Sequence, residues 1–338
     1  MMNVNTANRA SALLYSFIKE HINGTWLLPV NVCPDVPLTF YAAGVPFEFV
    51  DIDRSSLCIQ EEQCLDLLQK DDAHYAGIVF VRTYGYVYDS TSFFARCKSF
   101  NPNFQIIDDR CLCIPEETPD FYGADMVLYS TGHCKQIDLG GGGLAFYQVP
   151  TNYNRDMSHL YTGEDEEAQY KEAFAQRKQL NPVPKGWLNL EVYDGYDEYM
   201  AKINSQIPKR IELRKSLNQI YKKNLPSQIQ MPDAFNQWRF HIKLEPVLKN
   251  RVLEELFKNG LFASNHYQSA NRLFDKKVYV NSDMLYDSVI NLFNDKHYTE
   301  EMAKETCKII LANLNTGGAK VNIVCKSLII VSPNTIAA

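Results

Sequence analysis

Reactive polar side chains follow two of the apolar segments in this chain. Asp108 and Asp109 close the segment FQII, and Ser130 ends the segment DMVLYS. Lys135 comes five positions after Ser130, and the glycine run Gly140–Gly143 begins five positions after Lys135. A lysine amine that is activated by its surroundings attacks carbonyl groups, and a nearby carboxylate stabilises a positive charge. These residue types and their spacing predict covalent amine chemistry at Lys135.

Enzymes that use pyridoxal 5′-phosphate (PLP) need parts of this kind. A lysine amine binds the cofactor as a Schiff base, and a carboxylate keeps the pyridine nitrogen protonated. A helix N-terminus with a hydroxyl holds the phosphate, and glycines let the backbone approach the cofactor. We expect Lys135 in the first role and Asp109 in the second. We expect Ala10 and Ser11, at the start of a helix predicted for residues 8–21, to hold the phosphate.

The elements that must position these residues follow the pattern of an α/β domain. Short apolar runs alternate with amphipathic stretches, as in a largely parallel sheet that is flanked by helices. Ligands of such sheets bind at the carboxyl ends of the strands, where Asp109, Ser130 and Lys135 are expected. Further helices are predicted at 34–44 and 61–70, and strands at 26–30, 45–53, 76–85, 104–109, 124–131 and 140–149.

After about residue 150 the pattern changes to longer polar stretches with helical spacing. Helices are predicted at 164–178, 195–223, 247–260 and 298–314, and strands at 239–245 and 321–338. Thr299 is expected to cap the 298–314 helix, with Glu300 and Glu301 in its first turn. We therefore predict a large domain over residues 1–224 and a small α+β domain over residues 225–338.

The bulk composition excludes several classes of partner. A net charge of −6 and a pI near 5.7 argue against a broad surface for nucleic acid. No apolar run reaches the roughly 20 residues that span a bilayer, and the N-terminus lacks the features of a secretory signal. We therefore expect a cytoplasmic protein without a membrane partner. Nine scattered cysteines indicate reduced thiols, and the Cys111–Cys113 pair lacks further ligands, so no metal site is expected.

The segment STGHCKQIDLGGGG (130–143) resembles the Schiff-base segment of the DegT/StrS-type aminotransferases, which have the aspartate-aminotransferase fold (fold type I). FQIIDD (104–109) is similar to the strand that carries the ring-nitrogen aspartate of that family, and RTYGYVYD (82–89) to one of its turns. The stretch LLPVNVCP (27–34), followed by AGVPFEFVDID (43–53), resembles its strand–helix–strand at the edge of the cofactor. The similarity covers residues 8–150 in register, and the order of the motifs is more specific than any one of them.

The resemblance implies a mostly parallel seven-stranded sheet in the large domain and a homodimer with shared active sites. It also implies that PLP on Lys135 transfers an amino group from a glutamate-like donor. The acceptor would be a keto-sugar nucleotide or a related carbonyl compound, as in nucleotide-sugar biosynthesis. The cofactor-binding residues that it implies are Ala10, Ser11, Cys33, Asp109, Leu112, Ser130 and Lys135.

Three positions differ from the family pattern. Leu112 stands where Gln or His is usual, Gly141 where a Glu is usual, and Cys33 where an aromatic residue stacks on the pyridine ring. Two further hypotheses therefore stay open, a PLP-dependent lyase or dehydratase on the same scaffold, and a non-catalytic binding relative. Retention of both Lys135 and Asp109 argues against the binding relative.

Overall fold

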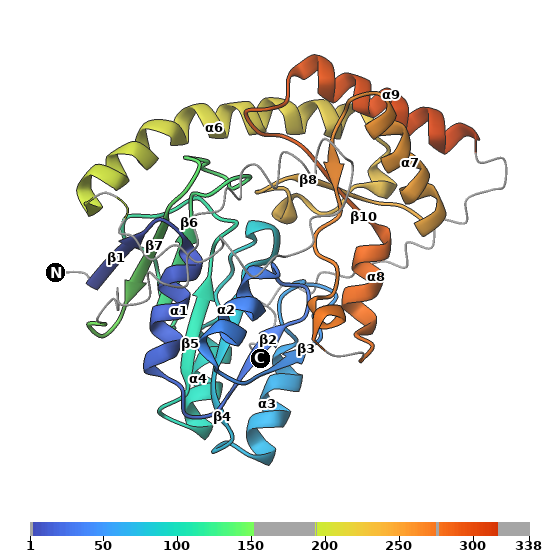
Figure 1. Cartoon of the computed structure of the whole chain (residues 1–338). Coiled ribbons are helices and arrows are strands. Elements are labelled where there is room, and N and C mark those ends of the chain that lie inside the picture. The colour runs from blue at the N-terminus through green and yellow to red at the C-terminus, as the bar shows by residue number, and fades with distance from the viewer. Residues whose placement is uncertain (1–2, 152–192, 194, 275–276, 317–338) are drawn as a thin grey trace, which may run out of the picture.

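Two β-sheets, one large and one small, organise the part of the chain that the structure describes. The computed structural model describes residues 3–151, 193, 195–274 and 277–316. The helix predicted at 164–178 and the strand predicted at 321–338 lie outside these residues. The large sheet comes first along the chain, and the small sheet belongs to the later residues (Figure 1).

The strands of the large sheet are β1 (Asn3–Ala7), β2 (Thr25–Pro29), β3 (Phe47–Val50), β4 (Tyr75–Val81), β5 (Gln105–Asp109), β6 (Met126–Ser130) and β7 (Gly143–Tyr147). Their order across the sheet is β1-β7-β6-β5-β4-β2-β3. β7 runs antiparallel to β1 and β6, and the other neighbouring strands are parallel. The predicted α/β fold with a mostly parallel seven-stranded sheet is confirmed.

The helices that cover the two faces of this sheet are α1 (Ala10–Glu20), α2 (Asp35–Ala43), α3 (Glu61–Lys70) and α4 (Thr91–Phe100), together with the first part of α6 (Tyr196–Asn224), which packs on β6 and β7. Successive side chains of a buried strand point to opposite faces. Accordingly, Trp26 and Leu28 of β2 join the hydrophobic cluster of α1 and α2, whereas Leu27 joins the cluster of α3 and α4. The large sheet therefore lies between two layers of helices (Figure 1).

The same alternation assigns a face to each polar residue at the ends of the strands. Ile107 of β5 joins the cluster of α1 and α2, and Ile106 joins the cluster of α3 and α4. Asp109 follows Ile107 by two residues, so its side chain lies on the α1 and α2 face, and Asp108 lies on the opposite face. Ser130 shares the face of Asp109, because it follows Leu128 of the same cluster by two residues.

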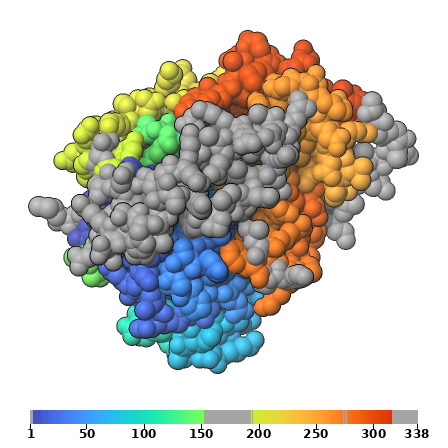
Figure 2. All heavy atoms as spheres, in the orientation of Figure 1, coloured from blue at the N-terminus to red at the C-terminus, as the bar shows by residue number. Residues whose placement is uncertain are grey.

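The small sheet has the order β8-β10-β9 and consists of antiparallel strands, β8 (Phe240–Lys243), β9 (Ala263–Ser264) and β10 (Val289–Leu292). The helices of this region are α6 (Tyr196–Asn224), α7 (Pro246–Lys258), α8 (Val280–Ser288) and α9 (Glu300–Thr316). The later residues, which are coloured orange and red, lie together at the upper right of Figure 2. Leu217 and Tyr221 of α6 pack into the core of this sheet. The predicted domain boundary after residue 224 falls where α6 ends, and it stays a prediction.

Four short 3₁₀ helices complete the described elements, η1 (Thr83–Gly85), η3 (Ser227–Ile229), η4 (Asp233–Phe235) and η5 (Ala270–Leu273). The strand predicted at 76–85 ends earlier, at Val81, because Tyr84 in η1 has a left-handed φ of 56°. The strand predicted at 140–149 begins only at Gly143, because Gly140 and Gly142 also have positive φ values. A left-handed backbone does not continue a strand.

Other elements lacked a clear signal in the sequence. The polar strand β1 was not predicted, nor were α4, α8 and β10. The predicted cap of α9 is confirmed, since the Met302 amide donates to the Thr299 hydroxyl at 3.2 Å. The cysteines of the described residues are free thiols. No helix among the described residues is both long enough and apolar enough to cross a membrane.

The junction of the two sheets contains a buried histidine. His241 of β8 is fully buried, and its ring stacks on Tyr84 with 4.0 Å between ring centroids. Burial, assisted by the positive charge of Arg239, lowers the pKa of His241 well below its ordinary value. The folded protein therefore keeps this ring neutral at a pH where the unfolded chain binds a proton.

We predict that the free energy of unfolding falls as the pH drops from 7 to 5. Below about pH 6.5 the unfolded state binds more protons than the folded state, and His241 contributes a loss of at most about 2 kcal/mol by pH 5. Urea unfolding at both pH values measures this loss. The loss of unfolding free energy between pH 7 and pH 5 should be smaller in His241→Phe than in the wild type. It should be unchanged in His74→Gln, which alters an exposed histidine. An equal pH dependence in all three proteins would contradict the assignment.

Candidate active site

Lys135 lies half-buried in the segment between β6 and β7. Burial by itself lowers the pKa of its ammonium group, but nearby acidic groups outweigh burial and raise the pKa above its ordinary value. The thiols of Cys111 and Cys33 have this effect only when they are ionised. At physiological pH the carboxyl groups of Asp109 and Asp35 are the acidic neighbours that raise the pKa of Lys135. The structure thus brings the predicted residues Lys135, Asp109 and Cys33 together, although they come from three separate segments.

Asp109, the last residue of β5, is a buried carboxyl group with 5% of its surface exposed. Its Oδ1 accepts a hydrogen bond from the Cys111 amide at 2.9 Å. Burial raises the pKa of Asp109, whereas the hydrogen bonds from Cys111 and the charge of Lys135 act in the opposite direction. A buried carboxylate is stabilised by a cation, so Asp109 suits a protonated ring nitrogen.

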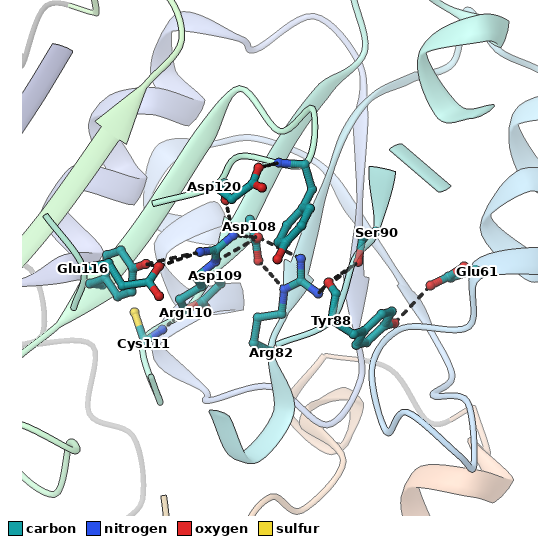
Figure 3. A network of polar contacts seen from close by, with 12 residues as sticks. Glu61, Arg82, Tyr88, Ser90, Asp108, Asp109, Arg110, Cys111, Glu116 and Asp120 are labelled. Carbon is teal, nitrogen blue, oxygen red and sulfur yellow. Dashed lines mark hydrogen bonds and ion pairs between the residues drawn. The ribbon is translucent and has the colours of Figure 1, made fainter. Parts of the chain in front are cut away.

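A network of ion pairs on the opposite face holds the end of β5 (Figure 3). Asp108 receives two hydrogen bonds from Arg82, Nε to Oδ1 at 2.7 Å and Nη2 to Oδ2 at 2.9 Å. Arg110 donates from Nη2 to Oδ2 of Asp108 at 2.8 Å, and both arginines are buried. The Arg82 amide also donates to the Asp109 carbonyl at 2.9 Å. Because bidentate arginine–carboxylate pairs have defined geometry, this network fixes the strand that carries Asp109.

The glycine run lies against the N-terminus of α1. The Gly142 amide donates to the Asn8 carbonyl at 2.7 Å. A Cβ atom at Gly143 would lie 2.5 Å from the Ala10 backbone nitrogen, so only glycine permits this close approach. Ala10 is the first residue of α1, and the first amides of a helix lack partners within the helix. The run therefore keeps β7 close to a helix end that can bind a phosphate.

Ser130 and the α1 N-terminus complete the polar groups of the site. Ser130 is buried at the end of β6, and its hydroxyl oxygen accepts a hydrogen bond from the Gly132 amide at 3.3 Å. Ala10 and Ser11 are half-buried in the first turn of α1. A lysine amine, a buried carboxylate and a glycine-lined helix N-terminus are present together, so the residues of this site fit PLP.

Two further predicted residues have different surroundings. Cys33 is half-buried, and burial, reinforced by the charge of Asp35, raises the pKa of its thiol to about 12. Cys33 is therefore a neutral thiol at physiological pH. Leu112 belongs to the hydrophobic cluster that contains Tyr84 and Trp238, and its carbonyl accepts from Gln136 Nε2 at 2.8 Å.

Sequence reasoning missed Asp35 and Cys111 as neighbours of Lys135. Asp35 begins α2, and burial raises the pKa of its carboxyl group while Lys135 and Arg9 lower it. An acidic residue in the first turn of a helix has an ordinary electrostatic reason to be there, so Asp35 carried no distinct signal. Cys111, two residues past Asp109, was considered only as a metal ligand.

The chain has the fold of known aminotransferases. No protein-family model matches the sequence, and no curated protein matches it. Solved structures that resemble it include the PLP form of Spr1654 from Streptococcus pneumoniae (TM-score 0.67, 16% identity, covering 92% of this chain and 87% of that chain). PseC of Helicobacter pylori, an aminotransferase involved in the biosynthesis of pseudoaminic acid, has a TM-score of 0.66, 16% identity, and coverage of 92% and 86%. The sugar aminotransferase CalS13 from Micromonospora echinospora has a TM-score of 0.64, 17% identity, and coverage of 92% and 87%.

The contact between the glycine run and α1 leads to a test with a matched control. We predict that Gly143→Ala destabilises the protein by about 1–3 kcal/mol, the usual effect of inserting a methyl group into a packed site. It should also weaken PLP binding, because α1 must move. Gly141→Ala should resemble the wild type, since its Cβ would meet the Asn8 carbonyl at an ordinary 3.5 Å. Thermal unfolding and PLP titration measure both effects, and similar behaviour of the two variants would contradict the prediction.

Proposed function

We propose that this protein is a PLP-dependent aminotransferase with Lys135 as the residue that binds the cofactor. The observation that carries the proposal is the convergence of Lys135 and the buried carboxyl group of Asp109 on one face of the sheet. The N-terminus of α1 adds a phosphate site at the same edge. The fold is that of solved aminotransferases, and Spr1654 is known in a PLP form.

Each residue of the site has a defined task in this proposal. The cofactor, when bound, supplies an electron sink for the electrons released at the substrate Cα. Lys135 would hold the cofactor through Nζ, and the same amine, when free, would act as the base that accepts the proton from Cα of the substrate. The carboxylate of Asp109 holds a proton on the pyridine nitrogen. Backbone amides at Ala10 and Ser11 and the Ser130 hydroxyl bind the phosphate.

Cys33 and Leu112 are proposed as apolar contacts of the cofactor. Cys33 suits this task as a neutral thiol, because a neutral thiol behaves as a small hydrophobe. At the position where the resemblance implies a stacking aromatic ring, Cys33 would leave more space above the cofactor.

The substrates are proposed from the relatives. PseC is an aminotransferase involved in the biosynthesis of pseudoaminic acid, and CalS13 is a sugar aminotransferase. We propose a glutamate-like amino donor and, as acceptor, a keto-sugar nucleotide or a related carbonyl compound. We also propose a homodimer with shared active sites and a cytoplasmic location.

Borohydride reduction tests the covalent bond between Lys135 and the cofactor. Wild type mixed with PLP should develop a visible absorption band that borohydride bleaches, because a lysine-bound cofactor is reduced to a stable amine. Lys135→Ala should lack this band, whereas Lys70→Ala, which alters an exposed lysine at the end of α3, should keep it. A normal band in Lys135→Ala would contradict the assignment. No band in the wild type at saturating PLP would favour a non-catalytic binding protein.

A neutral replacement at Asp109 tests the carboxylate proposed for the ring nitrogen. Asp109→Asn keeps the shape of the side chain and removes its charge. We expect loss of the visible band on mixing with L-glutamate to slow by about a hundredfold or more, because the electron sink needs a protonated nitrogen. Stopped-flow absorbance measures this rate, with Asp71→Asn at an exposed site as control. An unchanged rate in Asp109→Asn would assign the task to another group.

A further inference from the structure

A buried arginine of α6 contacts the segment that carries Lys135. Arg214 has 6% of its surface exposed. Its Nη1 donates to the Trp238 carbonyl at 2.5 Å and to Oδ1 of Asn294 at 2.7 Å. Its Nη2 donates to the Gln136 carbonyl at 3.2 Å and to the Lys135 carbonyl at 3.4 Å. One planar guanidinium group therefore joins three parts of the chain that are far apart in sequence.

The small-sheet side of the molecule holds three consecutive carbonyl groups around Lys135. Nε1 of Trp238 donates to the Cys134 carbonyl at 2.6 Å. Arg214 binds the next two, those of Lys135 and Gln136. Trp238 precedes β8 by two residues, and Asn294 follows β10 by two residues. The backbone at Lys135 is thus tied to both of these strands.

The surroundings of Arg214 are unfavourable for a residue that serves stability alone. The four oxygen atoms that accept its hydrogen bonds are uncharged. Burial, reinforced by the positive charge of Arg239, lowers the pKa of Arg214 to about 9. The charges of Asp295 and Asp138 act in the opposite direction, but these carboxylates form ion pairs with Arg239 and Lys296. A buried cation whose hydrogen-bond acceptors are uncharged gains little stability over a well-packed apolar side chain. The geometry of its donors is therefore the better reason for an arginine at this position.

We propose that Arg214 is a positioning residue that fixes the Lys135 segment to the small sheet and so directs Nζ of Lys135 toward Asp109. The role of this positioning in catalysis rests on the proposed function, but the position of Lys135 itself can be tested without the cofactor. Arginine is suited to this task, because its rigid fork binds several carbonyl oxygens at once, whereas a lysine ammonium is a point charge on a flexible chain. A shift of the small sheet would move the lysine with it.

Four variants separate positioning from general stability. Arg214→Gln removes the fork, and Arg214→Lys keeps the charge with fewer fixed donors. Trp238→Phe removes the indole donor to Cys134 and keeps a smaller aromatic ring in its place, so it serves if Arg214→Gln does not fold. Arg210→Gln is the control, because Arg210 is on the same helix one turn earlier and its side chain donates to Gln206 at 3.4 Å.

The first measurement follows the reactivity of the Lys135 amine in the cofactor-free protein. The reagent is trinitrobenzenesulfonate, and mass spectrometry after digestion gives the rate at Lys135 against pH, well below the melting temperature of each variant. A freed Lys135 leaves its acidic neighbours, so its pKa falls toward the ordinary value and labelling becomes faster. We expect an increase of about tenfold in Arg214→Gln, consistent with lost hydrogen bonds to a charged group, and smaller increases in Arg214→Lys and Trp238→Phe.

The second measurement follows PLP addition to the same proteins. We expect the visible band to form about tenfold more slowly in Arg214→Gln, with partial recovery in Arg214→Lys and wild-type behaviour in Arg210→Gln. Wild-type labelling rates and pH midpoints in both Arg214→Gln and Trp238→Phe would overturn the inference. If the wild type forms no band with PLP, the proposed function fails, and the labelling rates still decide whether Arg214 positions Lys135.

Discussion

Two neighbouring aspartates end β5 on opposite faces of the large sheet, and each buried charge needs its own compensation. Arg82 and Arg110 compensate Asp108 with paired hydrogen bonds on the face of α3 and α4. Asp109 has Lys135 and the amide of Cys111 on the other face. Burying a carboxylate without such partners is costly, so these contacts constrain the ends of β4, β5 and β6 together. The proposed chemistry depends on this division of the two charges between the faces.

Close backbone contact provides the second constraint on the site. Glycine at position 143 lets β7 pass against the first turn of α1, which leaves the helix N-terminus at the edge where Lys135 lies. The side chains of α6 and the small sheet provide the third constraint, because they hold the backbone carbonyls around Lys135. The lysine is thus positioned by the small sheet as well as by the strand that precedes it.

Much of the large domain could be predicted from the sequence. Short apolar runs and helices with clear ends are local signals, and they predicted β2, β5, β6 and α3 with small errors at the ends. The grouping of Lys135 with Asp109 was predicted from their places after successive strands and from motif spacing. Their catalytic tasks stay predictions. Elements that depend on distant partners for their stability were missed. The strand β1 is an example, because it is polar and pairs with β7, where Ala7 lies opposite Gly143, 136 residues later in the chain.

The sequence by itself determined the alternation of strands and helices, the reactive residue types at the strand ends and the glycines that a tight contact requires. Only the tertiary structure decided which groups surround the lysine. These groups include Asp35, Cys111 and Arg214. They are distant from Lys135 in the sequence or have no recognisable sequence signal, and the packing of separate segments brings them to the lysine. Periodicity reports which face of an element is buried. It does not report which distant side chain that face will meet, because that depends on the packing of the whole chain.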